Sequence, residues 1–408
     1  MKILAIVLIS FLALTGFAQS GKFTIDQAIN QALKNNGTIR SAALEVESQR
    51  ELKKTGFDLP KTNVSLLYGQ YNSYAKNDNN ITISQTIPFT ALGSQAKLNR
   101  SLLFASELKK SANENELTYQ VKQAYYNLAF TVSRQSLLLQ QDSLFDGFYK
   151  AASLRYKSGE TNLLEQTTAE AQRNEVKNQL RNNLADITVL QTQLKTLLNS
   201  ELLPEIAETS LKEIQFNETL DTTLSMNPSI NYIRQLIDVA NAQKKLEAAK
   251  FAPDFQIGAF SQTLIGVTNM ENTKIATSTD RFTGFQVGVA IPLWFVSHQG
   301  RVKSAEYSRQ VAQTNYQYST IALQGQLQQA VQQYLKNKNS LAYYKTSALP
   351  NADFILRQSQ IAFRGGDIGY AEYLLGVRNA INIKEGYLQT LSDYNQSIIY
   401  IEFLSGHK

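Results

Sequence analysis

Residues 155–160 read Arg-Tyr-Lys-Ser-Gly-Glu, and residues 362–367 read Ala-Phe-Arg-Gly-Gly-Asp, so that a glycine followed by a carboxylate recurs at the same place. The same offset along the chain also pairs Glu165 with Glu372. Glycine readily adopts the left-handed backbone conformation that a tight turn between two helices requires. The two stretches therefore predict two helical hairpins of one design within a single chain.

Further matches extend this duplication toward the N-terminal side of each turn. They are Asn36-Gly37-Thr38-Ile39 with Asn227-Pro228-Ser229-Ile230, Leu59-Pro60 with Ala252-Pro253, and Ile87-Pro88-Phe89 with Ile291-Pro292-Leu293. The matches keep the same order, and self-similarity of this kind indicates a repeated structural unit. We predict a first structural repeat over residues 19–215 and a second over residues 216–408.

The first 18 residues have the composition of an export signal. Lys2 supplies the positive charge, Ile3–Leu14 is a nearly unbroken apolar run, and Gly16-Phe17-Ala18 offers small residues for cleavage. The apolar run is shorter than the ~20 residues of a membrane-spanning helix. We therefore expect a signal peptide over residues 1–18. Because the chain contains no cysteine, we expect neither disulfides nor a lipid anchor of the bacterial lipoprotein kind.

The predicted helices are unusually long. The span from Pro88 to Pro204 has no internal proline, and the apolar residues of Leu180–Leu198 are spaced four and three apart, which is typical of a coiled coil. The predicted helical hairpins span residues 92–199 and 298–405. Pro350 is expected to break the outgoing leg of the second hairpin. Each repeat is expected to open with a further helix, and a capping box of Thr24 and Gln27 marks the start of the first.

Between the opening helix and the hairpin of each repeat, apolar residues alternate with small or polar ones. The apolar members of this pattern are Ile81, Ile83, Ile87, Phe285, Val287, Val289 and Ile291. The predicted strands span residues 62–74, 80–88, 254–264 and 282–292. Segments of about ten residues with one apolar face are what a transmembrane barrel requires, although a soluble β-sandwich shows the same alternation.

Four strands can close neither a sandwich nor a barrel by themselves. A membrane barrel needs at least about eight strands. A barrel built from the predicted strands therefore demands several copies of the chain. No later apolar run is long enough for a spanning helix, so any membrane insertion must use the strands.

The sequence offers no constellation of residues for catalysis or for metal binding. Its two histidines, His298 and His407, have no ligand partners at metal spacing. Phosphate-binding loops, nucleophile elbows and dinucleotide-binding fingerprints do not occur. The net charge of +6 is spread along the chain, which disfavours a nucleic-acid partner. We therefore predict no catalytic residues, no cofactor and no metal site.

Several short motifs, in this order and partly duplicated, resemble the TolC-type outer-membrane efflux protein family. They are Phe23-Thr24-Ile25-Asp26-Gln27-Ala28-Ile29, Leu33-Lys34-Asn35-Asn36, Tyr125-Tyr126-Asn127-Leu128, Asn227-Pro228, Ile291-Pro292-Leu293-Trp294 and the two glycine turns. The resemblance covers essentially the whole chain after the signal. It implies an α+β fold in which long antiparallel helical hairpins form a periplasmic α-barrel and four strands contribute to a membrane β-barrel.

The resemblance also implies a homotrimer, in which three chains of four strands each would close one barrel of twelve strands in the outer membrane. The cylinder of helices would cross the periplasm and dock at its tips onto a membrane-fusion adaptor. That adaptor would connect it to an inner-membrane pump, for which the RND type is expected. Outer-membrane lipid would surround the barrel.

The same resemblance places the two glycine turns at the periplasmic aperture. The implied aperture residues are Gly159, Glu160, Glu165, Gly366, Asp367 and Glu372. In a trimer, each carboxylate that faces the lumen becomes a ring of three charges, which attracts cations. Arg155 and Arg364 are close enough in sequence to pair with these carboxylates and latch the aperture shut.

The expected function is an outer-membrane duct of a tripartite efflux pump, which passively conducts heavy-metal cations or small toxic compounds to the exterior. One alternative within the same family is a duct for type I protein secretion. An alternative of another class is a periplasmic coiled-coil scaffold without a pore, which would be extractable without detergent.

Overall fold

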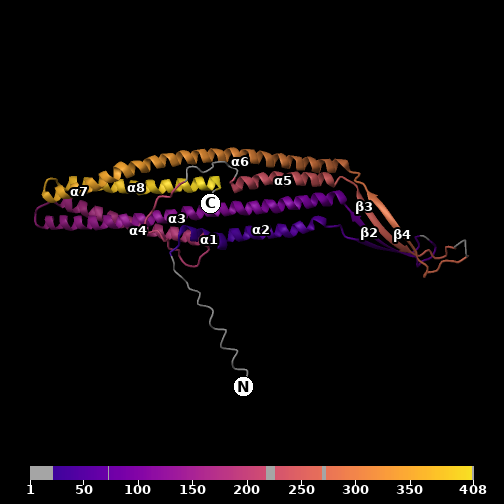
Figure 1. Cartoon of the computed structure of the whole chain (residues 1–408). Coiled ribbons are helices and arrows are strands. Elements are labelled where there is room, and N and C mark those ends of the chain that lie inside the picture. Colours follow the sequence, from indigo (N-terminus) through magenta and orange to yellow (C-terminus); the bar gives the residue numbers. More distant parts are fainter. Residues whose placement is uncertain (1–21, 72, 217–225, 269–272, 407–408) are drawn as a thin grey trace, which may run out of the picture. The chain divides into compact units, whose positions relative to one another are not determined.

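The computed structural model describes residues 22–71, 73–216, 226–268 and 273–406 (Figure 1). The predicted signal peptide over residues 1–18 lies outside the described residues, as does His407. The described residues form long α-helices and one antiparallel sheet. The predicted α+β fold class is confirmed.

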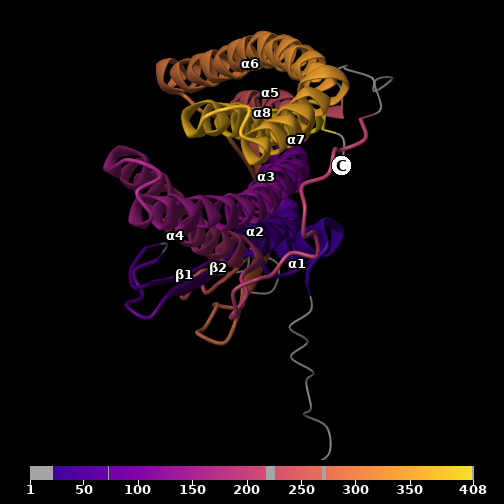
Figure 2. The same cartoon turned by 90° about the vertical axis from the view of Figure 1, so that its left-hand side faces the viewer.

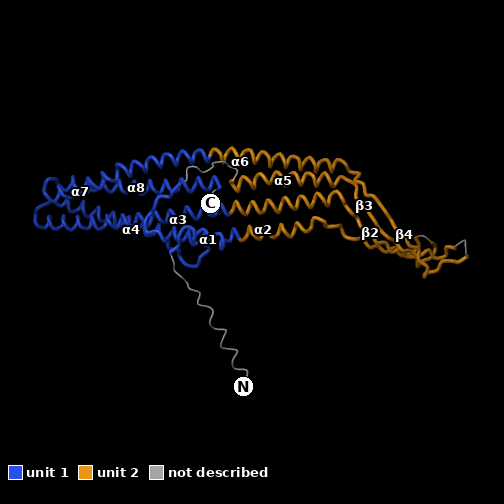
Figure 3. The backbone as a smooth tube through the Cα atoms, viewed as in Figure 1, with its two compact units in different colours: residues 1–39, 114–222, 326–408 blue, residues 40–113, 223–325 orange. Residues whose placement is uncertain are grey.

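The chain forms two compact units (Figure 3). Unit 1 comprises residues 1–39, 114–222 and 326–408, and unit 2 comprises residues 40–113 and 223–325. Each unit combines segments from both predicted repeats. The compact units therefore do not coincide with the predicted repeats. The repeat boundary at residue 215 stays a prediction.

Unit 2 contains the sheet, whose four strands follow one another in sequence order. The strands are β1 (Asn63–Tyr68), β2 (Asn79–Ile87), β3 (Asp254–Gln262) and β4 (Phe282–Ala290). All neighbours are antiparallel, and the register aligns Val64 with Ile83, Ile83 with Ala259, and Ala259 with Phe285. Residues aligned in this way lie on the same face of the sheet.

Strand β1 is shorter than the predicted segment of residues 62–74. Its ladder stops before Gly69, which has a φ of 125°. The N–H of Gly69 donates to the carbonyl of Asp78 over 2.8 Å and so closes the loop toward β2. The other three strands start and end within two residues of the predicted limits.

Two further helices precede the two pairs of strands, namely α2 (Gly37–Lys54), which continues into a 3₁₀ turn at Thr55–Phe57, and α5 (Pro228–Ala249). An asparagine caps each of them. The side chain of Asn36 accepts the N–H of Thr38 over 2.9 Å, and that of Asn227 accepts the N–H of Ile230 over 3.1 Å. The matching Asn-Gly-Thr-Ile and Asn-Pro-Ser-Ile motifs therefore both start a helix, because a capping side chain satisfies backbone donors that the first turn leaves free.

Unit 1 contains most of the helical hairpins, which Figure 2 shows from the side of their turns. Its helices are α1 (Ile25–Asn35), the C-terminal part of α3 (Phe89–Lys157), α4 (Leu163–Leu198), the end of α6 (Phe295–Tyr343), α7 (Leu349–Gly365) and α8 (Tyr370–Ser405). Helix α1 begins with the predicted capping box of Thr24 and Gln27. It ends at Asn35, so the predicted opening helix is divided in two at Asn36.

Pro350 changes the type of helix rather than the direction of the chain. Residues Tyr344–Ala348 form a π-helical segment between α6 and α7, and the residues flanking it keep right-handed helical backbone angles. Proline has no N–H to donate to the preceding turn, and its ring crowds the carbonyl four residues earlier. The wider π turn accommodates this defect, so that the expected break is a local change in hydrogen bonding.

An extended segment over residues 200–216 fastens several elements of unit 1 to one another. Ile206 bridges Phe23 as a short parallel pair, and the N–H of Leu211 donates to the Ser133 hydroxyl over 2.6 Å. The buried Asn395 accepts the N–H of Ile214 over 3.0 Å and donates to the carbonyl of Lys212 over 2.7 Å. The segment therefore joins the N-terminal segment, α3 and α8.

Candidate functional site

The predicted aperture residues lie in unit 1, at the two turns between long helices. In the first turn, Gly159 has a φ of 76°, the N–H of Glu160 donates to the carbonyl of Arg155 over 2.8 Å, and the N–H of Gly159 donates to that of Tyr156 over 3.1 Å. This pair of bonds satisfies carbonyls that the last helical turn would leave free. A glycine is needed at residue 159 because other residues resist a positive φ.

The second turn has the same hydrogen bonds. Gly366 has a φ of 81°, and its N–H donates to the carbonyl of Phe363 over 3.2 Å. The N–H of Asp367 donates to the carbonyl of Ala362 over 2.9 Å. The stretches 155–160 and 362–367, which match in sequence, therefore fold into matching turns.

Glu165 lies at the centre of the polar contacts at the first turn. Its carboxylate contacts the Arg155 guanidinium over 2.9 Å and accepts the Thr161 hydroxyl over 2.5 Å. Its N–H donates to the side chain of Asn162, which caps α4. The Glu165 side chain keeps only 16% of its exposure, whereas that of Arg155 keeps 38%. Of the two predicted latch arginines, Arg155 thus has a carboxylate partner, and this partner belongs to its own hairpin.

The remaining predicted charged residues form fewer polar contacts than Glu165 does. Glu160, Arg364 and Asp367 are exposed, and none of them forms an ion pair among the residues that the structure describes. Glu372 accepts the N–H of Gly369 at a long 3.4 Å, as part of the start of α8. The second turn thus lacks an ion pair like that of Arg155 with Glu165 among the described residues.

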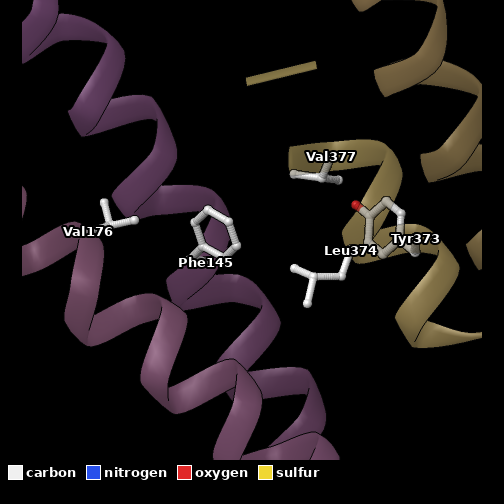
Figure 4. Close-up of a cluster of buried hydrophobic side chains, with 5 residues drawn as sticks. All are labelled: Phe145, Val176, Tyr373, Leu374 and Val377. Carbon is white, nitrogen blue, oxygen red and sulfur yellow. The ribbon is translucent and has the colours of Figure 1, made fainter. Parts of the chain in front are cut away.

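A cluster of buried apolar side chains lies behind the turns, and in it the two hairpins meet (Figure 4). Its buried members are Phe145, Val176, Tyr373, Leu374 and Val377. Phe145 of α3 lies between Val176 of α4 and the three residues of α8. Phe363 stacks on Tyr373 with ring centroids 4.6 Å apart, and it has no hydroxyl with which to take part in a polar latch.

Tyr370 is a further polar residue at the turns, and it was not among the residues predicted from the sequence. Its hydroxyl is buried and has no hydrogen-bond partner among the described residues. Burial, and secondarily the negative charge of Glu165, raises the pKa of Tyr370 to about 12. Its position at the start of α8, seven residues after Phe363, is the only signal in the sequence. Whether its hydroxyl is buried depends on how the two hairpins pack.

The sheet of unit 2 presents a second functional surface. One face carries exposed apolar side chains, and Phe285 and Val287 keep 92% and 78% of their exposure. The opposite face carries mainly small and polar residues, such as Thr82, Ser84 and Gln286. The predicted alternation of apolar and polar residues is therefore realised in one continuous sheet.

Within the described residues, no helix is long and apolar enough to cross a membrane. The same residues contain no group of three or more histidine, cysteine or acidic side chains placed to hold a metal ion. His298 packs its ring against Phe251, with centroids 5.6 Å apart.

Comparison with known proteins identifies the class. The structure is similar to that of the outer-membrane channel OprN, with a TM-score of 0.80 at 16% sequence identity; the match covers 94% of this chain and 90% of OprN. It is also similar to that of CusC, with a TM-score of 0.76 at 17% identity; this match covers 95% of this chain and 93% of CusC. The CusC structures concern conformational changes that accompany folding and transmembrane channel formation. The fold of the chain is thus that of outer-membrane channels of the TolC type.

The sequence matches the same class of protein. Residues 219–406 match the family model described as outer membrane efflux protein. The chain is also 23% identical over 380 residues to the probable outer membrane lipoprotein SilC of Salmonella typhimurium, a match that covers 86% of the chain and 78% of SilC. SilC is named a lipoprotein, whereas this chain contains no cysteine. The predicted resemblance is confirmed, and the similar proteins named here are described as outer-membrane proteins or channels.

Proposed function

We propose that this chain is one subunit of the outer-membrane duct of a tripartite efflux pump, which passively conducts its substrates from the periplasm to the exterior. The observation that supports this function best is the sheet of unit 2. It exposes a continuous apolar face, and both of its edge strands, β1 and β4, have a strand on one side only.

Such a sheet is unstable alone in water. Exposed edges offer unpaired backbone groups to other chains, and large exposed apolar patches mark surfaces that are covered in the functional state. Pairing β1 of one copy with β4 of the next satisfies the edges, and lipid covers the apolar face. We infer a homotrimer, since three sheets of four strands each supply the twelve strands of the barrel that the family resemblance implies.

The turns of the helical hairpins then form the periplasmic aperture. Glu160, Glu165, Asp367 and Glu372 contribute carboxylates near the opening, and Gly159 and Gly366 shape the turns. The ion pair of Arg155 with Glu165 holds the first turn closed on itself, and the free Arg364 is available to a neighbouring subunit. The partners are a periplasmic membrane-fusion adaptor at these turns and, through it, an inner-membrane pump of the RND type. The cargo we favour is a heavy-metal cation or a small toxic compound.

Single-channel conductance in a planar bilayer tests the function and the aperture together. We expect the detergent-purified wild type to be trimeric and to show a small, cation-selective conductance. Glu165→Gln removes one charge per subunit and releases Arg155, so its conductance should rise and its preference for cations should fall severalfold. Asp186→Asn is the matched control, because Asp186 is an exposed carboxylate on the same helix, far from the turn.

Two outcomes would contradict the proposal. A monomeric protein that is soluble without detergent and does not conduct would leave the scaffold as the function. Equal selectivity in Glu165→Gln, Asp186→Asn and the wild type would preserve the duct but remove Glu165 from its aperture.

A further inference from the structure

A groove with a volume of about 970 Å³ lies in unit 2, along helix α3 and between α2 and α5. Its charged lining consists of Lys53, Lys97, Arg100, Lys245, Glu107 and Asp238. Four cationic side chains therefore face two carboxylates, although no part of the proposed duct function requires a basic groove here.

The four cations of the groove outnumber its two carboxylates. None of them forms an ion pair among the described residues, and all four are exposed. Neighbouring cations in the same unit behave differently, since Lys54 pairs with Glu51, Lys109 with Glu45 over 2.8 Å, and Lys244 with Glu306 over 3.0 Å. Positive charges that converge without partners repel one another, and an anion placed between them would relieve that repulsion.

Hydrogen bonds between the helices show the level of each charged residue along the groove. The Thr90 hydroxyl donates to the carbonyl of Ala249, and the Asn99 amide to that of Leu52, so the end of α5 and the end of α2 both lie beside the first turns of α3. Lys245 and Lys53 therefore lie at the level of Lys97 and Arg100, near the strands. Since the side chain of Gln235 donates to the carbonyl of Ser101, Asp238 lies near the level of Arg100, and only Glu107 lies further from the strands.

The other lining residues complete a site of mixed character. Ser94 and Asn241 offer hydrogen bonds beside the cations, and Leu103 and Phe104 add an apolar wall. Phe104 keeps 50% of its exposure. An arginine presents several donors in a fixed planar arrangement, whereas lysines supply mobile point charges, and together they suit the oxygens of a phosphate group.

We propose that the strand-proximal end of this groove binds a phosphate group, with Lys53, Lys97, Arg100 and Lys245 as its ligands. The phosphate belongs either to the headgroup of an anionic lipid or to a soluble anion. The site is independent of the aperture, so it can exist whether or not the chain forms a duct.

The test uses the full chain purified in detergent and compares the wild type with Lys97→Gln/Arg100→Gln. The control is Arg301→Gln/Lys303→Gln, which removes the same charge from α6 of the same unit. Isothermal titration with inorganic phosphate measures the soluble anion. Native mass spectrometry with phosphatidylglycerol and with zwitterionic phosphatidylcholine measures retention of lipid.

We expect phosphate or phosphatidylglycerol to bind the wild type and the control alike, and to bind Lys97→Gln/Arg100→Gln at least about tenfold more weakly, because charge-assisted hydrogen bonds are lost. Selective retention of phosphatidylglycerol identifies a lipid headgroup, and binding of phosphate without lipid selectivity identifies a soluble anion. Equal affinities in both double variants, or no binding of either probe to the wild type, would overturn the proposal.

Discussion

Tyr370 illustrates how a single residue can set the stability of the turns. A buried hydroxyl without a hydrogen-bond partner costs roughly 1–3 kcal/mol relative to a satisfied or absent one. We therefore expect Tyr370→Phe to stabilise the protein by about 1 kcal/mol at neutral pH, measured as a higher midpoint of thermal unfolding. Tyr156→Phe is the control, because Tyr156 lies near the same turn but is exposed. A lower midpoint for Tyr370→Phe would show that the hydroxyl has a partner in the assembled protein.

The same residue predicts a dependence on pH. The pKa of Tyr370 is raised to about 12 in the folded chain, above its ordinary value of about 10. The unfolded chain therefore ionises first, and the stabilising contribution of the neutral phenol, complete below pH 10, is lost as the pH rises toward 12. Wild type should lose more stability over this range than Tyr370→Phe, because other tyrosines affect both equally. Parallel stability curves would contradict the assignment.

The sequence predicted individual residues where the local backbone conformation or the repeated motif determines their place. Gly159 and Gly366 follow from the need for a positive φ, and Glu165 followed from its match with Glu372 at the same offset along the chain. Tyr370 was missed because its burial depends on contacts between hairpins that are distant in sequence. Sequence proximity alone does not decide the ion pairs. Arg155 pairs with Glu165 ten residues away, whereas Arg364 is only three residues from Asp367 and forms no ion pair among the described residues.

At the level of the elements, the sheet depends on glycines opposite a large ring. Phe260 lies beside Gly284 on neighbouring strands, and a Cβ added at Gly284 would come within 2.6 Å of the Phe260 ring. At Gly288 the nearest atom would be 3.5 Å away, which is an ordinary contact. The ring of Phe260 thus occupies the space that a side chain at residue 284 would need.

We expect Gly284→Ala to be less stable than Gly288→Ala by about 1–3 kcal/mol, because the ring of Phe260 must leave its position. The measurement is the midpoint of heat-induced loss of strand signal by circular dichroism. In a Phe260→Ala background the difference between the two alanine variants should vanish. If it persists, the cost arises from the backbone of β4 and not from the ring.

The strands were predictable because alternation alone assigns each residue to a face. The pairing of the strands was harder to predict, since nothing in the local sequence shows that β2 and β3, which are separated by helices α3, α4 and α5, lie side by side. The division of the opening helix at Asn36 was also missed. Periodicity runs through that residue, and only the extended backbone there interrupts it.

At the scale of the whole molecule, the apolar face of the sheet should require lipid. Val287→Lys places a charge on that face, and charges on the lipid side of a membrane strand cost roughly 2–4 kcal/mol at mid-depth. We expect fewer trimers in the outer-membrane fraction, measured by native mass in detergent. Gln286→Lys, on the adjacent residue of the opposite face, is the control and should assemble normally. Equal trimer yields would argue that the face is covered by protein.

The whole-molecule plan was only partly visible in the sequence. Duplicated motifs led to the prediction of two repeats, yet the compact units each draw on both, because contacts follow spatial neighbours and not chain order. The extended segment over residues 200–216 was also not predicted. It has no periodicity, and it is held by hydrogen bonds to residues distant in sequence, such as Ser133 and Asn395.

The π-helical segment Tyr344–Ala348 changes the angular phase of the chain that follows it. A π turn takes in one more residue than an α turn, and one residue corresponds to about 100° of rotation about the helix axis. Side chains of α7 therefore point about a quarter turn away from where an uninterrupted α-helix continued from α6 would place them. An alignment of helix faces between the two hairpins must therefore be counted afresh from Leu349. A deletion of one residue within 344–348 would rotate all side chains of α7 together about the helix axis.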